Sequence, residues 1–129
     1  QAGGHMAHRP MSAAEIDARV NEGYAHLSPA RRRLFDALRI APERWQLHPW
    51  GDTCGGFWVV ALFGRQALWF NEIEDGFNRS RWTHLGVLDD YRCNQDELQH
   101  ALAAVERILQ TGNDGDSTLG PPQRIIDDA

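Results

Sequence analysis

The sequence has no lysine, so all 13 of its basic residues are arginine. The 18 acidic residues outnumber them, which gives a formal net charge of −5 and a pI near 5.6. Nucleic-acid-binding surfaces are basic, because contacts with phosphate groups dominate their affinity. The charge balance therefore argues against a nucleic-acid partner. The basic cluster at 31–33 opens a predicted helix and is typical of a solvated helix face.

Cysteine and long apolar runs are also scarce. Cys54 and Cys93 are the only cysteines, and their spacing matches no zinc or redox motif. A disulfide between them fits the sequence, and two reduced thiols in a cytosolic protein fit it at least as well. The longest apolar run, FWVVALF at 57–63, is too short to span a membrane. With no visible signal peptide, we expect a cytoplasmic protein without a membrane partner.

The chain length of 129 residues fits one domain with a real core. Residues 1–6, QAGGHM, are typical of a cloning scar, and we expect all of 1–11 to be disordered. Residues 113–129 are rich in glycine, proline and aspartate and predict a flexible tail. A single α+β domain is therefore expected over 12–112.

Capping signals and apolar spacing predict two helices before the sheet. Ser12 and Glu15 form a capping-box pattern, and apolar residues follow at helical spacing through residue 27. Ser28 and the proline after it mark the start of a second, short helix. This helix should end near Ile40, because Pro42 disfavours helical geometry in the residue before it.

The segment 44–91 predicts an antiparallel meander of four to five strands. Residues 57–63 are apolar without alternation, which is typical of a central strand covered on both faces. Gly64 and Arg65 suit a two-residue hairpin turn in which the glycine takes a positive φ. The expected strands cover 45–47, 57–63, 66–73, 77–82 and 87–91.

Residues 94–112 predict a final helix with a strongly apolar stripe. Asn94 stands at the expected N-cap, acidic residues follow in the first turn, and Gly112 closes the helix. The predicted fold class is therefore α+β. Two N-terminal helices precede the meander, and one C-terminal amphipathic helix packs on the sheet.

The polar segment after the central hairpin is the predicted functional surface. Arginine and aromatic side chains are enriched at interface hot spots, and an acidic rim steers a basic partner. We expect the segments 89–91 and 94–97 to extend this acidic surface. The alternative is a structural role, with the aromatic residues in the core and the arginines in local ion pairs. The predicted partner-binding residues are Asn71, Glu72, Glu74, Asp75, Phe77, Asn78, Arg79, Arg81 and Trp82.

Patterns for catalysis and metal binding are weak. Glu72 and Glu74 share a strand face and invite an acid–base pair, but a solvated or partner-facing acidic edge fits them better. The histidines show no HxH or HExxH spacing. Cys93 lies just before the final helix, among acidic residues that disfavour a thiolate. We therefore expect no catalytic residues, metal or cofactor.

Small size, acidity and a single α+β domain are shared by many bacterial immunity and antitoxin proteins, which bind a toxin domain that is often a basic nuclease. No specific family is indicated, and the likeness is one of general properties. We predict a non-enzymatic, toxin-neutralising binding module with a basic protein partner. The alternative is a small-molecule-binding or hydrolytic protein with a tryptophan-lined pocket and Glu72, His84 and Cys93 as reacting groups. A homodimer joined through an exposed strand or the tryptophans is a third option.

Overall fold

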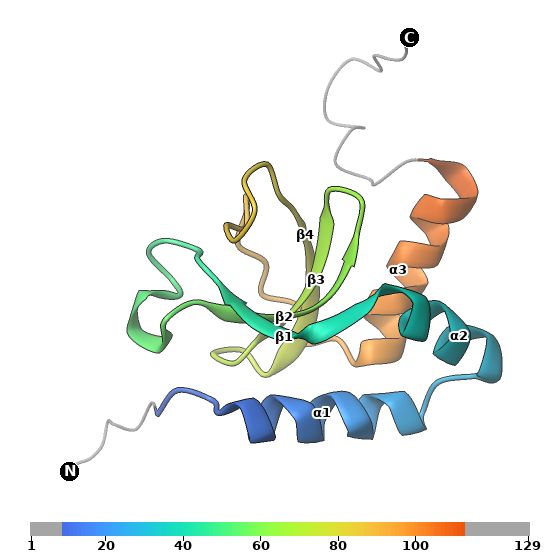
Figure 1. The fold of residues 1–129 in the computed structure, drawn as a ribbon, viewed down its shortest axis with the longest axis horizontal. Coiled ribbons are helices and arrows are strands. Elements are labelled where there is room, and N and C mark those ends of the chain that lie inside the picture. The colour runs from blue at the N-terminus through green and yellow to red at the C-terminus, as the bar shows by residue number, and fades with distance from the viewer. Residues whose placement is uncertain (1–8, 113–129) are drawn as a thin grey trace, which may run out of the picture.

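The computed structural model describes residues 9–112 as three α-helices and a four-stranded antiparallel sheet in the order β1-β2-β3-β4 (Figure 1). This confirms the predicted α+β fold, with two N-terminal helices, a meander and a C-terminal helix on the sheet. Residues 1–8 and 113–129, which hold the expected scar and tail, lie outside the described residues. In chain order the elements are α1 (Ala13–Ala25), α2 (Pro29–Leu38), β1 (Arg39–Trp45), a short 3₁₀ helix (Asp52–Cys54), β2 (Phe57–Phe63), β3 (Gln66–Asn71), β4 (Gly76–Arg81) and α3 (Leu98–Thr111).

The start of α1 is fixed by the predicted capping box. The Ser12 hydroxyl accepts the N–H of Glu15 at 3.1 Å, and the Glu15 carboxylate accepts the N–H of Ser12 at 2.8 Å. Arg9 donates to both carboxylate oxygens of Glu15, and these bonds, with those from Ser12, lower the pKa of Glu15 to about 2. The end of the segment that we expected to be disordered is therefore bonded to the first turn of the helix.

The second helix begins after Ser28 as predicted, but the chain enters β1 directly at Arg39. The strand expected over 45–47 is therefore placed wrongly, because β1 ends where it should begin. Pro42 does not break β1, since β1 is an edge strand and a proline there removes no required ladder bond. The register of β1 against β2 shifts between Arg39 and Glu43, the interval that contains this proline.

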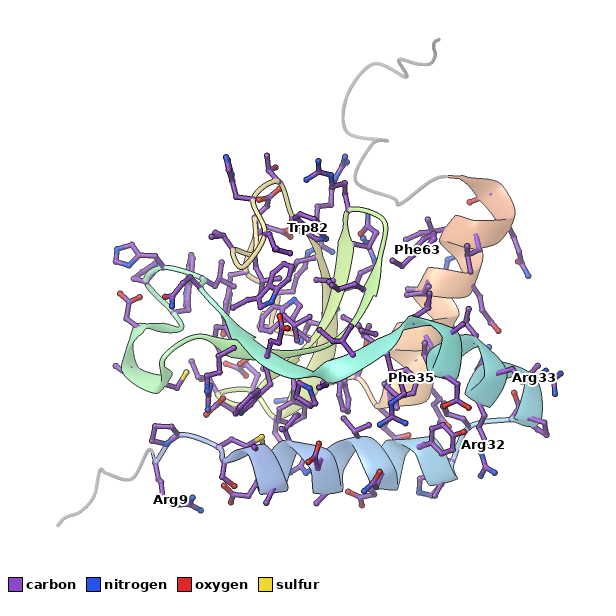
Figure 2. The ribbon with its side chains drawn as sticks, in the orientation of Figure 1. Arg9, Arg32, Arg33, Phe35, Phe63 and Trp82 are labelled. Atoms are coloured by element: carbon purple, nitrogen blue, oxygen red, sulfur yellow. The ribbon has the colours of Figure 1, made fainter. Side chains whose placement is uncertain are left out.

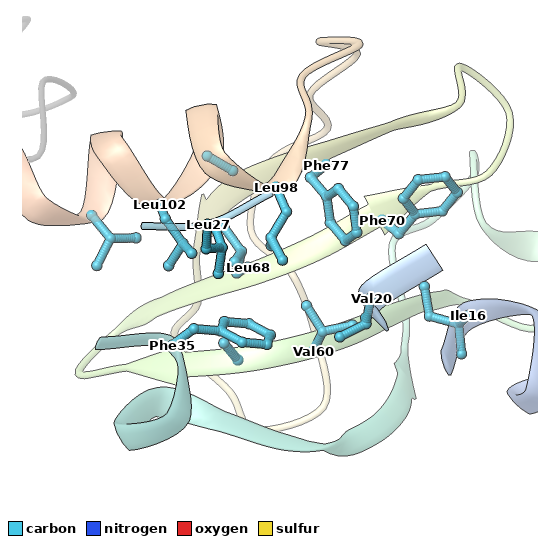
Figure 3. Close-up of a cluster of buried hydrophobic side chains, with 13 residues drawn as sticks. Ile16, Val20, Leu27, Phe35, Val60, Leu68, Phe70, Phe77, Leu98 and Leu102 are labelled. Atoms are coloured by element: carbon cyan, nitrogen blue, oxygen red, sulfur yellow. The ribbon is translucent and has the colours of Figure 1, made fainter. Parts of the chain in front are cut away.

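The sheet is covered on both faces, which confirms the prediction for residues 57–63. All three helices cover one face, where α1 runs along the sheet and α2 and α3 lie toward one end of it (Figure 1). Their shared core extends from Ile16 past Phe77 and Leu98 to Phe35 and Leu102 (Figure 3). A second hydrophobic cluster lies on the opposite face of the sheet. Its side chains come from the sheet and from the connections at 46–56 and 82–97, and include Trp45, Leu47, Cys54, Phe57, Trp69 and Leu88.

Side-chain bonds to the backbone change two of the predicted strands. Gly64 takes a φ of 55° at the β2–β3 turn, as expected. However, β3 ends at Asn71, because the Asn71 side-chain oxygen accepts the N–H groups of Ile73 and Glu74 and closes a turn. The strand expected over 87–91 is wrong, since Val87 makes only one isolated bridge, to Gln46.

The final helix starts later than predicted. The prediction that Asn94 caps it is wrong, because α3 begins at Leu98 with Glu97 as its N-cap. The backbone of Asn94 is instead bonded by the side chain of Asn78. Gly112 ends the helix with a φ of 72°, as expected.

A buried ion pair joins β1 to the turn after β3 and to the start of α1. Arg44 Nη1 lies 2.9 Å from Glu72 Oε1, and the Glu72 side chain is only 5% exposed. Glu72 also accepts the N–H of Met11 at 2.7 Å, and Arg44 donates to the Met11 carbonyl. The Arg44 guanidinium covers the Trp58 ring at 4.5 Å from its centroid. Glu72 is thus a structural residue.

Replacing Glu72 should therefore destabilise the fold. Glu72→Gln leaves the Arg44 charge without its counterion in a largely buried position, which costs about 2 to 3 kcal/mol. Urea unfolding followed by far-UV circular dichroism measures this loss. The matched control is Glu22→Gln, an exposed substitution on α1 that should change stability by less than about 0.5 kcal/mol. Equal stability of the two variants would contradict the structural role of Glu72.

Candidate functional site

A groove of about 560 Å³ opens between α1, the β3–β4 turn and the segment that leads into α3. Figure 1 shows this turn on the side of the sheet nearest α1. The groove is larger than the cavity between α2, the β2–β3 hairpin and α3. The residues that line it are Arg19, Glu22, Gly23, His26, Phe70, Glu74, Asp75, Phe77, Gln95, Asp96, Glu97, Leu98 and Gln99.

The groove is strongly acidic and has an apolar base. Five of its lining residues carry a carboxylate, against one arginine and one histidine. Its apolar lining residues Phe70, Phe77 and Leu98 belong to the helix-side core and are at most 4% exposed. A groove with apolar atoms at its base and carboxylates around them suits a lysine or arginine side chain, whose methylene groups are apolar and whose end carries a positive charge.

Two glycines let the walls of the groove approach each other. A Cβ atom at Gly23 would lie 2.7 Å from the Cβ of Leu98, so only glycine permits this contact between α1 and α3. A Cβ atom at Gly76 would lie 2.3 Å from the Cα of Gln95, against backbone that cannot move aside. From the sequence, Gly23 only weakens a helix and Gly76 only suggests a bulge or turn. Their packing role depends on residues far away in the chain.

Hydrogen bonds fix the acidic segment before α3 against β4. The buried side chain of Asn78 donates to the Asn94 carbonyl and accepts the Asn94 N–H, both at 2.9 Å. Two residues further on, the Phe77 N–H donates to the Asp96 carbonyl at 2.8 Å. The carboxylates of Asp96 and Glu97 are therefore carried on a backbone that the sheet holds in place.

Arg19 is the one arginine in the lining of the groove. Its Nη1 atom lies 2.5 Å from Asp75 Oδ1, and its guanidinium carbon lies 5.1 Å from the centroid of the Phe70 ring. The two charged side chains are 39% and 66% exposed, so water screens the pair and its contribution to stability is small. Asp75 has a φ of 60°, a left-handed conformation that aspartate tolerates better than most residues.

The structure divides the nine predicted contact residues into three groups. Glu74 and Asp75 line the groove, and Phe77 lies at its base. Asn71 and Asn78 are at most 1% exposed, and their side chains bond the backbone at Arg92 and Asn94. With Glu72 paired to Arg44, these three polar side chains hold the fold. Buried and bonded in this way, Asn71, Glu72 and Asn78 present little side-chain surface to a partner.

The remaining three predicted residues lie away from the groove. Arg79 donates to Gln66 Oε1 at 2.6 Å, and Arg81 is exposed at the end of β4. The Trp82 ring packs edge-on against the Trp45 ring, with their centroids 5.5 Å apart. Trp82 lies well away from α1 (Figure 2). Successive side chains of a strand point to opposite faces, so the predicted continuous surface is split between the two sides of the sheet.

The sequence interpretation missed the contribution of α1. Arg19, Glu22 and His26 are spaced by three and four residues and therefore share one face of that helix. This spacing is visible in the sequence. What it does not show is that this face lies opposite the β3–β4 turn and the start of α3.

The groove is not the tryptophan-lined pocket of the alternative hypothesis. Trp45 and Trp69 are buried, and Trp58 and Trp82 pack against the two core clusters. Trp50 is 47% exposed, and its ring stacks on the Tyr91 ring with the centroids 4.6 Å apart. Neither cavity is lined by a tryptophan, or by Glu72, His84 or Cys93.

Comparison with known proteins gives no relative for this chain. No protein-family model, curated protein or solved structure matches it. In residues 9–112, no helix is long and apolar enough to cross a bilayer. The same part of the chain has no group of three or more histidine, cysteine, aspartate or glutamate residues arranged to hold a metal ion.

The clamp between Asn78 and Asn94 can be tested by mutation. Asn78→Ala leaves the N–H and carbonyl of Asn94 without partners, which should destabilise the protein by about 1 to 3 kcal/mol. Hydrogen exchange of the amides at 94–97 should accelerate. Asn94→Ala is the matched control, because it preserves the backbone groups that Asn78 binds. If both variants exchange alike, the clamp does not hold this segment.

The two cysteines should differ in reactivity. Both are free: Cys54 is buried, Cys93 is exposed, and burial raises the pKa of the Cys54 thiol. A thiol reagent such as Ellman's reagent should therefore modify one thiol quickly in the native protein and both in urea. Cys93→Ser should remove the fast reaction. If both thiols react quickly in the native protein, or if neither reacts until a reducing agent is added, this arrangement is wrong.

Proposed function

We propose that this chain is a non-enzymatic protein-binding module whose acidic groove receives a basic segment of a partner protein. The observation that carries the proposal is the groove itself, in which five carboxylates surround an apolar base. Charge complementarity of this kind raises the association rate and excludes wrongly charged partners. Phe70, Phe77 and Leu98 are at most 4% exposed, so a bound segment meets the apolar base over a small area and the carboxylates carry most of the recognition.

The partner in this proposal is a basic toxin domain, and the chain is a bacterial, cytoplasmic, toxin-neutralising protein of the immunity or antitoxin kind. Its net charge of −5 supports a basic partner. Its groove walls, fixed by Gly23, Gly76 and the Asn78 clamp, suit binding without rearrangement. The reacting groups of the hydrolytic alternative lie outside the groove, and no observation favours that function.

The proposal predicts that charge removal in the groove weakens binding, whereas the same change elsewhere does not. A groove triple variant removes three carboxylates: Glu22→Gln, Glu74→Gln and Glu97→Gln. A control triple variant removes three exposed or partly exposed carboxylates outside the groove: Asp17→Asn, Glu43→Gln and Glu106→Gln. Both change the net charge equally, so any difference between them reports on the position of the charges.

Purified products of the genes adjacent to this one are tested for binding by isothermal titration calorimetry at two salt concentrations. The expected result is one basic protein that binds with 1:1 stoichiometry. The groove triple variant should bind it at least about tenfold more weakly and with a smaller salt dependence, because three charge contacts are lost. Equal affinity of the two triple variants, with melting temperatures unchanged, would refute the groove as the binding site.

A further inference from the structure

We infer that the groove is built for the guanidinium group of a partner's arginine, and that Arg19 occupies this position until the partner replaces it. This inference rests on the proposed function and names the chemical group that the groove selects. It also gives the contact between Arg19, Asp75 and Phe70 a role in binding.

Arg19 lies in the groove as a bound arginine should. Its guanidinium is placed over the Phe70 ring, 5.1 Å from the centroid, while one nitrogen contacts the Asp75 carboxylate at 2.5 Å. An aromatic face combined with a carboxylate is the environment that guanidinium groups prefer in protein interfaces. The contacts of Arg19 are therefore those that we expect for an arginine side chain of a bound partner.

The occupant is exchangeable, whereas the site is fixed. Arg19 is held by an ion pair whose partners are 39% and 66% exposed, and its long side chain can turn into solvent without movement of α1. Phe70 lies in β3 and packs against Phe77 with ring centroids 5.0 Å apart. Replacing one arginine by another therefore leaves the core unchanged and makes Arg19 a competitor of the partner.

The charges around the site favour this replacement. Besides Asp75, the groove holds Glu22, Glu74, Asp96 and Glu97, and Arg19 supplies its only arginine. A basic segment brings additional cations to these carboxylates, which a single internal arginine does not provide. Departure of Arg19 also removes a positive charge that repels the incoming segment.

The geometry selects arginine over lysine. A planar guanidinium stacks on an aromatic ring and presents several N–H groups to a carboxylate at the same time. A lysine ammonium is a compact and strongly hydrated charge, so it gains less from the ring of Phe70. Arginine should therefore bind more tightly than lysine in peptides of equal length and charge.

The test uses two short synthetic probes: an acetylated, amidated peptide of alternating arginine and glycine, and the same peptide with lysine. Arg19→Gln should bind the arginine peptide about three- to tenfold more tightly than the wild type, because an exposed ion pair no longer competes. The gain for the lysine peptide should be smaller. The matched control Arg33→Gln removes the same charge from an exposed position on α2 (Figure 2) and should change either affinity less than about twofold.

Arg19→Ala provides a second variant that removes both the charge and the cover over Phe70, and its melting temperature, compared with that of Arg19→Gln, shows whether stability contributes to the result. Compared with Asp75→Asn alone, adding either Arg19 substitution should bring no further gain, because Asp75→Asn removes both the competing ion pair and the carboxylate that would hold the peptide. Asparagine accepts the left-handed conformation of residue 75.

The outcomes separate this inference from the proposed function. If the groove triple variant weakens peptide binding but the Arg19 variants behave like Arg33→Gln, the groove binds basic segments and the role of Arg19 is refuted. An equal gain for the lysine peptide refutes the selection of guanidinium. If the wild type and both Arg19 variants bind neither peptide, this inference and the acidic groove as a receptor fail together.

Discussion

The structure depends on polar side chains of the sheet that bond the backbone of a long irregular connection. A connection such as 82–97 pairs few of its backbone groups with one another, and unpaired groups are costly when buried. Asn71 donates to the Arg92 carbonyl at 2.9 Å, and Ser80 donates to the Asp90 carbonyl at 2.8 Å. With the Asn78 clamp, these bonds attach the connection to β3 and β4. They allow it to cover the second face of the sheet and to deliver the acidic segment before α3 to the groove.

Accumulating carboxylates around the groove opposes folding, because like charges repel each other in the compact state. The ion pair between Arg19 and Asp75 offsets part of this repulsion, while Asp96 and Glu97 are kept in place by backbone bonds. A local arrangement that folding alone does not require is typical of a functional site. The groove and the buried core therefore differ in kind: the core is packed from apolar side chains, whereas the groove gathers five carboxylates around one arginine.

Elements with strong local signals could be predicted from the sequence, whereas those decided by distant residues could not. The capping box at Ser12 and the helix end at Gly112 depend on nearby residues, and both predictions are confirmed. Asn94 has the same side chain that a helix cap needs, but its backbone bonds to Asn78 decide its conformation. The candidate site shows the same division. Residues 74 and 75 follow from their place in a polar turn, while the opposing wall on α1 depends on packing across the core.

Gly23 and Gly76 have an evolutionary consequence. Each stands where a methyl group would collide with the neighbouring wall, so neither position can drift without displacing that wall. Glu22 and Glu97 carry no such restriction, since both are exposed. Lineages that diversify this protein can therefore exchange the charges one at a time on an unchanged frame. Under the proposed function, the positions that fix the frame of the groove and those that set its charge are therefore largely separate.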